Sequence, residues 1–310
     1  MTAKERSAMP TLYDEEKMHK LPAGLRFFDI NDLWPIAHRR VVRWLFARPV
    51  TANQITLLSL VMGVLSAGCF LTAGYRGLAA GAFFLYAKLY LDNIDGNLAR
   101  VRGETSRLGR FLDSAVDFTV TVLVYSALTF RLVRETGDPS LWFLGLAAML
   151  SGLIHCSFFV FHLVSCASLE GAYEKNRRDE SITEEDRTAC RQQTPLVHFL
   201  QRFHLAVYGW QDRLVTGLDR FSRHLAGLPD TPQAHKTWYA NKRFLTLASP
   251  LCLCTNNMTL VVFSLCDALQ ACFIFIVGLG NLYMAGLAGW KIVRFKCAPQ
   301  KEEGPVRAEA

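Results

Sequence analysis

The chain has 310 residues, of which 51% are hydrophobic and 20% are charged, and its formal net charge is +7. The 12% of aromatic residues excludes a disordered chain, and the length excludes a small domain held together by disulfides. The mean hydropathy is positive, which favours a membrane protein if the apolar residues are grouped in stretches of about 20, the length that crosses a bilayer. A basic chain binds either nucleic acid or an anionic membrane surface, and the positions of its charges decide between the two.

Residues 1–54 are predicted to form a polar tail followed by an amphipathic helix at the membrane interface. The helix is expected within 29–48, where Asp32 can cap its start and Pro35 is tolerated in the first turn. Apolar and basic side chains alternate along this segment, so that arginines can stay near lipid phosphates while apolar groups enter the interface. The apolar residues are Trp34, Ile36, Val41, Trp44 and Leu45, and the basic ones are Arg39, Arg40, Arg43 and Arg48. Packing of the helix on the protein itself is the alternative.

Six apolar stretches follow, each long enough to cross a bilayer as a helix. They cover residues 55–75, 78–98, 110–131, 141–165, 244–265 and 268–290. The predicted fold is therefore all-α, a polytopic membrane protein with six transmembrane helices. Residues 55–168 contain the first four spans and residues 244–295 contain the last two.

Lysine and arginine are distributed unevenly between the two sides of the predicted membrane. Thirty of the 34 lie in the terminal segments and in the connections 99–110 and 169–243, which share one side in a six-span topology. Only Arg76, Arg131 and Arg134 lie on the other side. By the positive-inside rule, both termini are expected in the cytoplasm, and the protein is expected in a cell inner membrane or an endomembrane. A cytoplasmic face then explains the net charge, and no nucleic-acid partner is expected.

The segment 169–243 is predicted to be a helical cytoplasmic insertion between spans four and five. After Pro195, apolar residues recur at steps of three and four through about 30 residues, which predicts one long amphipathic helix. They are Leu196, Leu200, Phe203, Val207, Trp210, Leu214, Leu218, Phe221 and Leu225. The stripe is expected to pack against a helix at 183–193 or the membrane surface, with a lid over a functional site and a dimer contact as alternatives. Residues 296–310 are predicted to be a disordered tail.

Four aspartates lie at the cytoplasmic edge of the second and third spans. Asp92 and Asp95 are three residues apart, and Asp113 and Asp117 are four apart, so that each pair shares one face of its helix. The connection 99–109 is short, which makes the two helices antiparallel neighbours. All four carboxylates are therefore expected to converge. Ionisable residues in spans are costly and are candidates for function by default.

Four adjacent carboxylates repel one another unless cations neutralise them. Their hard oxygen ligands suit Mg²⁺, Mn²⁺ or Ca²⁺, and two divalent ions balance the charge of the cluster. Gly96 and Ala99 leave one helix surface bare, Gly109 does the same on the facing helix, and Arg100 and Arg110 add positive charge for phosphate. Metals and arginines together predict a polyanionic substrate such as a pyrophosphate.

These residues belong to a longer pattern, which reads Asp92-x2-Asp95-Gly96-x2-Ala99-Arg100-x8-Gly109-x3-Asp113-x3-Asp117. The pattern resembles, at every fixed position, the signature of the CDP-alcohol phosphatidyltransferase family. Upstream, residues 51–56 are similar to the family's Thr-Pro-Asn-x-Ile-Thr entry to its first span, with Ala52 in place of the proline. The resemblance covers about 50–132 by motif, and the insertion 169–243 lies outside it.

The resemblance implies that a CDP-linked alcohol donates its substituted phosphoryl group to a hydroxyl acceptor, with release of CMP. It implies Mg²⁺ or Mn²⁺ as cofactor, with two ions held mainly by Asp92, Asp95 and Asp113. Asp117 is expected to touch the second ion and to be the catalytic base. Nucleotide and phosphate binding are expected at Gly96, Ala99, Arg100, Gly109, Asn53 and Thr56. The family also leads us to expect a homodimer in a lipid bilayer.

The family works in two directions. CDP-diacylglycerol donates a phosphatidyl group to a small polar alcohol, or CDP-choline or CDP-ethanolamine donates to diacylglycerol or a related lipid alcohol. Compact length and the form Gly-Asn-Leu-Ala-Arg at 96–100 favour the first. The interiors of spans four to six contain no lysine or arginine, which disfavours a phosphorylated acceptor, although Lys242, Arg243, Lys291 and Arg294 lie at their cytoplasmic ends.

His155 and His162 are candidates for acceptor binding, because they lie seven residues apart on one face of the fourth span. Packing between helices is the alternative for both, as it is for the Thr255–Asn257 cluster. Two other classes of protein also remain open. One is a non-catalytic lipid-binding protein, and the other is an ion-translocating membrane protein. For the motif itself, helix packing with buried ion pairs such as Asp92 with Lys88 is the structural alternative.

Overall fold

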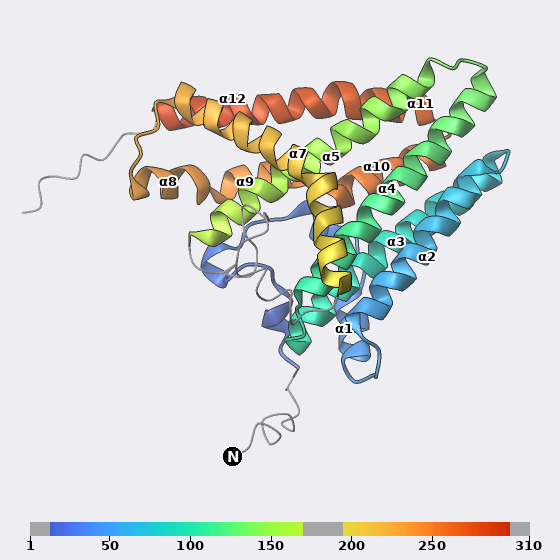
Figure 1. Ribbon diagram of the computed structural model, residues 1–310, viewed down its shortest axis with the longest axis horizontal. Coiled ribbons are helices and arrows are strands. Elements are labelled where there is room, and N and C mark those ends of the chain that lie inside the picture. The colour runs from blue at the N-terminus through green and yellow to red at the C-terminus, as the bar shows by residue number, and fades with distance from the viewer. Residues whose placement is uncertain (1–12, 170–194, 298–310) are drawn as a thin grey trace, which may run out of the picture.

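The computed structural model describes residues 13–169 and 195–297, and within these residues the chain is helical and contains no strand. The four helices that follow the N-terminal segment form a bundle: α2 (Ala52–Leu71), α3 (Tyr75–Arg102), α4 (Arg107–Thr136) and α5 (Leu141–Ser168). In Figure 1 the turns that join α2 to α3 and α4 to α5 lie at one end of the bundle, opposite the N-terminal segment.

Local sequence signals set the ends of these helices. The Thr51 side chain accepts from the backbone N–H of Gln54, and the Gln54 side chain accepts from the backbone N–H of Thr51, which forms a capping box at the start of α2. Gly103 ends α3 with a φ of 69° and Ser106 caps the start of α4, so only a short turn separates the two helices. α3 and α4 therefore run antiparallel, as predicted, and both pack against α2.

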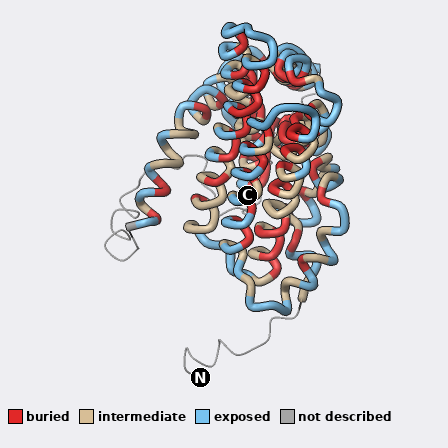
Figure 2. The backbone as a smooth tube through the Cα atoms, turned by 90° about the vertical axis from the view of Figure 1, so that its right-hand side faces the viewer, coloured by how far each residue is buried: buried red, intermediate tan, exposed pale blue. Residues whose placement is uncertain are grey.

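Small residues allow the helices of the bundle to pack closely. A Cβ atom on Gly63 of α2 would lie 2.3 Å from a methyl group of Val120 of α4, a separation that no side chain tolerates. At the end opposite the N-terminal segment, Arg131 of α4 donates hydrogen bonds to the carbonyl oxygens of Thr72 (2.7 Å) and Gly74 (3.1 Å). The buried residues follow the inward faces of the helices (Figure 2).

The second half of the chain adds a long helix, a run of short ones and a C-terminal helix. They are α7 (Pro195–Ala226), α8 (Pro232–Tyr239), α9 (Lys242–Ala248), the 3₁₀-helix η5 (Ser249–Leu251), α10 (Leu253–Leu265), α11 (Leu269–Phe275), the π-helix η6 (Ile276–Gly280) and α12 (Asn281–Cys297). α7 lies against α4, α5 and α12. The long helix predicted after Pro195 is therefore confirmed.

The face of α7 that contacts the bundle contains only part of the predicted apolar stripe, from which Leu200 is buried and Leu218 packs against buried residues. Leu196, Trp210, Leu214, Phe221 and Leu225 of that stripe are exposed. The buried face carries Val197, Leu200, Gln201, Gln211, Val215, Asp219, Ser222 and Ala226. Polar residues can lie on this face because they find partners, as where Ser157 of α5 donates to Gln211 Oε1 at 2.7 Å. The helix predicted at 183–193 lies outside the described residues, and contact of the stripe with a membrane stays a prediction.

Four helical segments of the described chain are long and apolar enough to cross a membrane: α2, α4, α5 and the segment Leu269–Cys297. The segments Lys242–Leu251 and Leu253–Leu265 pass this test only as a pair and meet at a bend of 41°, which gives a fifth span if they are counted as one. α3 has 28 residues but does not pass, because Lys88, Asp92 and Asp95 reduce its apolar content. The predicted number of six spans is therefore not confirmed.

The N-terminal segment differs from the prediction of one helix over 29–48. Two short 3₁₀-helices, η2 (Glu15–Met18) and η3 (Ala23–Leu25), precede a third, η4 (Ile30–Leu33), and an α-helix, α1 (His38–Phe46). Ala37 interrupts the predicted helix with a φ of 58°, and Asp29 rather than Asp32 caps the first turn. α1 packs on the protein through Val42, while Trp44 stays 59% exposed. The packing alternative therefore holds for one face of α1.

Candidate active site

Three of the four predicted aspartates, one on α3 and two on α4, come together in the structure. Asp92 of α3 and Asp113 and Asp117 of α4 each offer a carboxylate oxygen, and these oxygens lie within 4.8 Å of one another. The three residues are half-buried, so the group is neither sealed in the core nor free in solvent. The convergence predicted from spacing and a short connection is confirmed for this three-carboxylate cluster.

Asp95 points away from the cluster toward α2. The hydroxyl of Thr56 donates a hydrogen bond of 2.5 Å to Asp95 Oδ2, and the two residues are only 3% and 5% exposed. Asp95 is therefore held against α2 by a charge-assisted hydrogen bond and is not part of the group of three. Its predicted role as a metal ligand stays a prediction, while Thr56 gains a defined partner.

Lys88 supplies a positive charge inside the site. Its ammonium group donates to Asp92 Oδ1 at 2.9 Å and also to Asp117 Oδ1, and the side chain is 1% exposed. The pair of Lys88 with Asp92, considered above as part of a structural alternative, is thus present. Through its second contact, with Asp117, Lys88 bridges α3 and α4, the two helices that carry the motif. One ammonium cannot balance the whole set of carboxylates, so negative charge is left over.

The remaining carboxylate oxygen indicates where a cation fits. Asp113 Oδ1 is fully buried and has no hydrogen-bond partner among the described residues. A buried polar atom without a partner is costly, and coordination to a cation removes that cost. Carboxylate oxygens are the ligands that Mg²⁺ and Mn²⁺ prefer. The residues present therefore fit a divalent metal ion, whose identity and number stay predictions.

Arg100 lies beside the surface of α3 that Gly96 leaves bare. Its Nε donates to the Met18 carbonyl oxygen at 2.9 Å, and its Nη2 donates to Asn97 Oδ1 at 2.7 Å. A Cβ atom on Gly96 would lie 3.3 Å from Arg100 Nη1. The absence of a side chain at position 96 thus lets the guanidinium group lie along the helix, where it remains a candidate for phosphate binding.

The other predicted nucleotide-site residues are placed as follows. A Cβ atom on Gly109 of α4 would lie 3.2 Å from Asn53 Oδ1, so the two residues adjoin across α2 and α4. Ala99 is half-buried on α3, and the guanidinium group of Arg110 lies 5.0 Å from the centre of the Phe111 ring. Nucleotide binding by Asn53, Ala99 and Gly109 stays a prediction.

His155 and His162 lie apart from the three-carboxylate cluster. His155 Nε2 is 3.0 Å from Asn281 Oδ1, and His162 Nδ1 is 3.1 Å from Lys291 Nζ, so both histidines connect α5 with α12. Both side chains are buried. These contacts match the packing alternative. Acceptor binding by either histidine stays a prediction.

Sequence reasoning missed Tyr208, which α7 places beside α4. Its hydroxyl donates to the carbonyl oxygen of Ser114 at 3.0 Å. Burial raises the pKa of Tyr208, and the charges of Asp117 and Asp113 raise it further. The only signal in the sequence was the helical spacing of polar residues at 204, 208 and 211, which the apolar stripe outweighed.

Comparison with known proteins supports the interpretation of the motif. Residues 49–174 match the family model described as CDP-alcohol phosphatidyltransferase. A bifunctional IPC transferase and DIPP synthase of Thermococcus kodakarensis is 33% identical over 110 residues, which are 36% of this chain and 24% of that protein. The archaetidylinositol phosphate synthase of Pyrococcus horikoshii is 36% identical over 83 residues, covering 25% of this chain and 40% of the relative.

A bacterial relative shares a similar region. The inner membrane protein YnbA of Escherichia coli is 28% identical over 107 residues, which are 34% of this chain and 53% of that protein. The matched regions thus span about a quarter to half of the length of these curated relatives. The model match contains all four aspartates together with Lys88, Thr56 and Arg100. Residues 49–174, which are less than half of the chain, are therefore similar to the CDP-alcohol phosphatidyltransferase family.

Proposed function

We propose that the chain transfers the phosphatidyl group of CDP-diacylglycerol to the hydroxyl of a small polar alcohol and releases CMP. The observation that carries this proposal is the three-carboxylate cluster inside the region that is similar to the CDP-alcohol phosphatidyltransferase family. Its Asp113 Oδ1 atom is buried without a hydrogen-bond partner in the part of the chain that the structure describes, as expected for a group that coordinates a cation. The Pyrococcus relative, an archaetidylinositol phosphate synthase, also supports a role in lipid synthesis.

Asp92, Asp113 and Asp117 are the residues that would hold Mg²⁺ or Mn²⁺, and Asp95 would join them if it turned from Thr56. When bound, the metal supplies charge that neutralises the pyrophosphate and polarises the reacting phosphorus. Two ions are proposed, because Lys88 balances only part of the negative charge.

The residues of the chain bind the substrates and manage one proton. Asp117 takes the proton of the acceptor hydroxyl, whose oxygen bonds to the phosphorus that carries the diacylglycerol. The bond from that phosphorus to the bridging oxygen breaks, and CMP leaves with this oxygen. Lys88 holds Asp117 in place through their ion pair. We propose that Arg100, which lies along Gly96, binds a phosphate of the donor.

The long apolar helices and the family match indicate an integral membrane protein. We further propose that the site faces the cytoplasm, because the basic residues gather on that side in the six-span topology. The six spans and the homodimer belong to the same proposal. In this arrangement the diacylglycerol chains stay in the bilayer, while the cytidine and the acceptor enter from water.

The proposal is tested with the purified full chain in lipid nanodiscs. Radiolabelled CDP-diacylglycerol and CDP-choline are each offered with a panel of acceptors in Mg²⁺, Mn²⁺ or EDTA, and lipid product and CMP are measured. We expect CMP only with a divalent metal and with CDP-diacylglycerol as donor. Product from CDP-choline and diacylglycerol would reverse the direction of transfer. No CMP with either donor, either metal and any acceptor would remove the enzyme proposal.

A further inference from the structure

The long helix α7, Pro195–Ala226, carries an apolar face that the bundle leaves uncovered. This apolar face consists of six side chains that are each between 41% and 65% exposed: Leu196, Phe199, Trp210, Leu214, Phe221 and Leu225. They are separated by three, four, seven or eleven residues, so they share one side of the helix. The buried residues that pack on α4, α5 and α12 lie on a different side, and α7 as a whole lies outside the family match, which ends at 174.

A row of arginines runs beside the apolar face. This arginine row consists of Arg202, Arg213 and Arg220, all of them exposed. Arg202 follows Phe199 by three residues and Arg213 follows Trp210 by three, so the arginine row and the apolar face are neighbours on the helix surface. The exposed surface of α7 is therefore apolar along one side and positively charged along the edge of that side.

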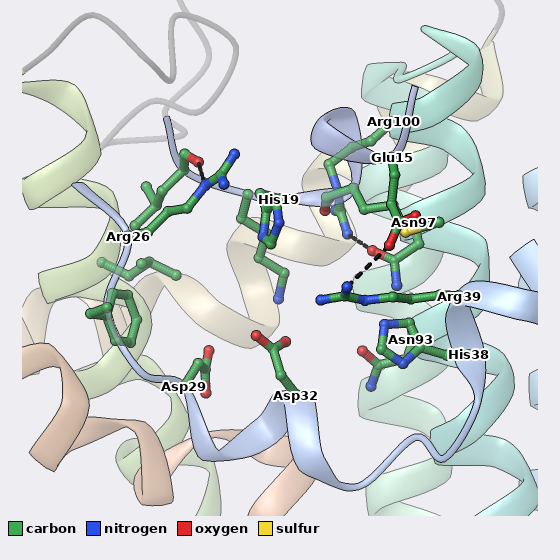
Figure 3. A pocket seen from close by; sticks show the side chains of 15 residues that line it. Glu15, His19, Arg26, Asp29, Asp32, His38, Arg39, Asn93, Asn97 and Arg100 are labelled. Atoms are coloured by element: carbon green, nitrogen blue, oxygen red, sulfur yellow. Dashed lines mark hydrogen bonds and ion pairs between the residues drawn. The ribbon is translucent and has the colours of Figure 1, made fainter. Parts of the chain in front are cut away.

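No described carboxylate forms an ion pair with the arginine row. The two acids of α7 lie elsewhere on the helix: Asp219 is buried and pairs with Arg223 at 3.0 Å, and Asp212 is half-buried. The N-terminal segment is different, because in its cavity of about 190 Å³ beside α3 the guanidinium group of Arg39 is paired with Glu15 at 3.0 Å (Figure 3). The charge of the arginine row is therefore left for a partner outside the described residues.

Contacts with the bundle place α7 at the level of the three-carboxylate cluster. The Tyr208 hydroxyl donates to the carbonyl oxygen of Ser114, which lies on α4 between two aspartates of that cluster, and Ser157 of α5 donates to Gln211. At 1.5 Å per residue, Ser114 lies about 33 Å and Ser157 about 24 Å along its helix from the turn that joins α4 to α5. The hydrocarbon core of a bilayer is about 30 Å thick, so α7 meets the bundle near the membrane edge opposite that turn. Figure 1 shows α7 crossing α5 instead of running along it.

We propose that α7 lies on the membrane surface and binds anionic phospholipids. The apolar face enters the boundary between headgroups and acyl chains, and the arginine row binds lipid phosphates whose negative charge no choline group offsets. A helix in this position needs one side toward the bundle, one toward acyl chains and one toward headgroups and water, and α7 has a buried, an apolar and a charged side. The inference is independent of the transfer reaction proposed above, because the residues that carry it do not belong to the three-carboxylate cluster.

A second copy of the chain fits this surface less well than lipid does. Around a two-fold axis the same surface meets itself, so two apolar faces could pair. The same contact would bring two arginine rows into one interface, where no exposed carboxylate of α7 separates them. An anionic phospholipid supplies both the acyl chains that cover the apolar face and the negative charge that the arginine row lacks.

The first test identifies what covers the apolar face. The full chain is placed in nanodiscs that contain phosphatidylglycerol and phosphatidylcholine brominated in its acyl chains, and tryptophan emission is compared with that in unbrominated lipid. The signal lost in Trp210→Phe is the emission of Trp210, and we expect bromine to quench most of it. Trp238, which is 2% exposed, is the control, and the signal lost in Trp238→Phe should stay unquenched. Emission of Trp210 that bromine leaves intact would overturn the inference, because something other than lipid would then cover the face.

The second test measures the choice of lipid. Spin-labelled phosphatidylglycerol and spin-labelled phosphatidylcholine are compared by electron paramagnetic resonance, which gives the preference of the full chain for the anionic lipid. The triple variant Arg202→Gln, Arg213→Gln, Arg220→Gln should lower this preference by about twofold or more and weaken its dependence on salt, since each basic residue near an anionic surface adds to the attraction. Lysine at the same three positions keeps the charge and should keep the preference.

An unchanged preference for phosphatidylglycerol in the glutamine variant would overturn the inference, and so would an equal loss in the lysine variant. All three positions are exposed, so both variants should keep the Tm of the unmodified chain. Neither test measures turnover, so loss of the transferase proposal would leave both results in force.

Discussion

The buried ammonium group of Lys88 on α3 forms an ion pair with the carboxylate of Asp117 on α4, and it also binds Asp92. This contact joins the two helices that carry the family motif at the level of the three-carboxylate cluster. Lys88 is only 1% exposed, so little water reaches the carboxylates it neutralises, and water cannot take over the role of its ammonium group. A divalent metal ion bound by Asp92 and Asp117 would therefore compete with Lys88 for the same carboxylates.

Replacing Lys88 by methionine should tighten Mn²⁺ binding, because the competing ammonium group is gone. We expect about a tenfold gain in affinity, together with a lower Tm in EDTA, since buried carboxylates lose their partner. Mn²⁺ titration followed by electron paramagnetic resonance and thermal unfolding with and without metal measure the two effects. Lys88→Arg keeps the charge and serves as the control. Weaker Mn²⁺ binding in Lys88→Met would mean that the lysine supports the metal site instead of competing with it.

Asp117→Asn should keep CDP binding and lose most turnover, because an amide cannot take the proton of the acceptor hydroxyl. We expect kcat to fall by about 10²- to 10⁴-fold, the usual contribution of general-base catalysis. The CDP Kd and kcat are measured on the same preparation. Asp92→Asn is the comparison and should weaken metal and nucleotide binding together. Near-normal turnover in Asp117→Asn would exclude this residue as the base.

Thr56→Val removes the hydroxyl that donates to Asp95 and leaves a buried carboxylate with one donor fewer. We expect the apparent free energy of unfolding to fall by about 1–3 kcal/mol, the cost of an unsatisfied buried polar group. Thr56→Ser keeps the hydroxyl and should retain most of the stability. Thermal unfolding of the three proteins in one detergent gives the comparison, and equal stability of the valine and serine variants would show that the hydrogen bond contributes little.

Asp219 attaches the insertion to the C-terminal helix. Its carboxylate accepts from Trp238 Nε1 at 2.9 Å, from the Tyr239 hydroxyl at 2.6 Å and from Arg223 Nε at 3.0 Å, and it lies 4.0 Å from Lys291 Nζ of α12. Asp219→Ala should lower the free energy of unfolding by about 3–5 kcal/mol, because it leaves buried donors and a buried ammonium group without their acceptor. Limited proteolysis should then cut the segment 195–243 faster.

The double variant Asp219→Ala, Lys291→Met separates charge from packing. It removes the uncompensated ammonium group, so part of the lost Tm should return relative to Asp219→Ala alone. The matched control combines Asp219→Ala with Lys236→Met, which replaces an exposed lysine of α8, and it should not restore the Tm. If the double variant is less stable than Asp219→Ala, Lys291 stabilises this region through contact with aromatic rings, since its Nζ lies 4.3 Å from the centre of the Trp238 ring.

Helix positions were predictable where apolar stretches and capping residues coincide. The stretch at 55–75 corresponds to α2, Ala52–Leu71, whose start is set by the capping box at Thr51 and Gln54. The segment 29–48 was not predictable as two short helices. Its amphipathic pattern continues through Ala37, and the left-handed conformation there leaves no mark in the side-chain pattern. The inward face of α7 was also missed, because polar residues become favourable inside only when partners from α4, α5 and α12 meet them.

The sequence by itself determined that Asp92, Asp113 and Asp117 meet, because spacing along two helices and a short turn between them leave little freedom. Only the tertiary structure decided that Asp95 faces Thr56, that Lys88 joins the cluster and that residues 15–39 build a charged cavity beside α3. These contacts depend on how each helix is rotated about its axis and on which distant segments lie against it. Such choices are made by packing over the whole chain, and no local pattern of residues encodes them.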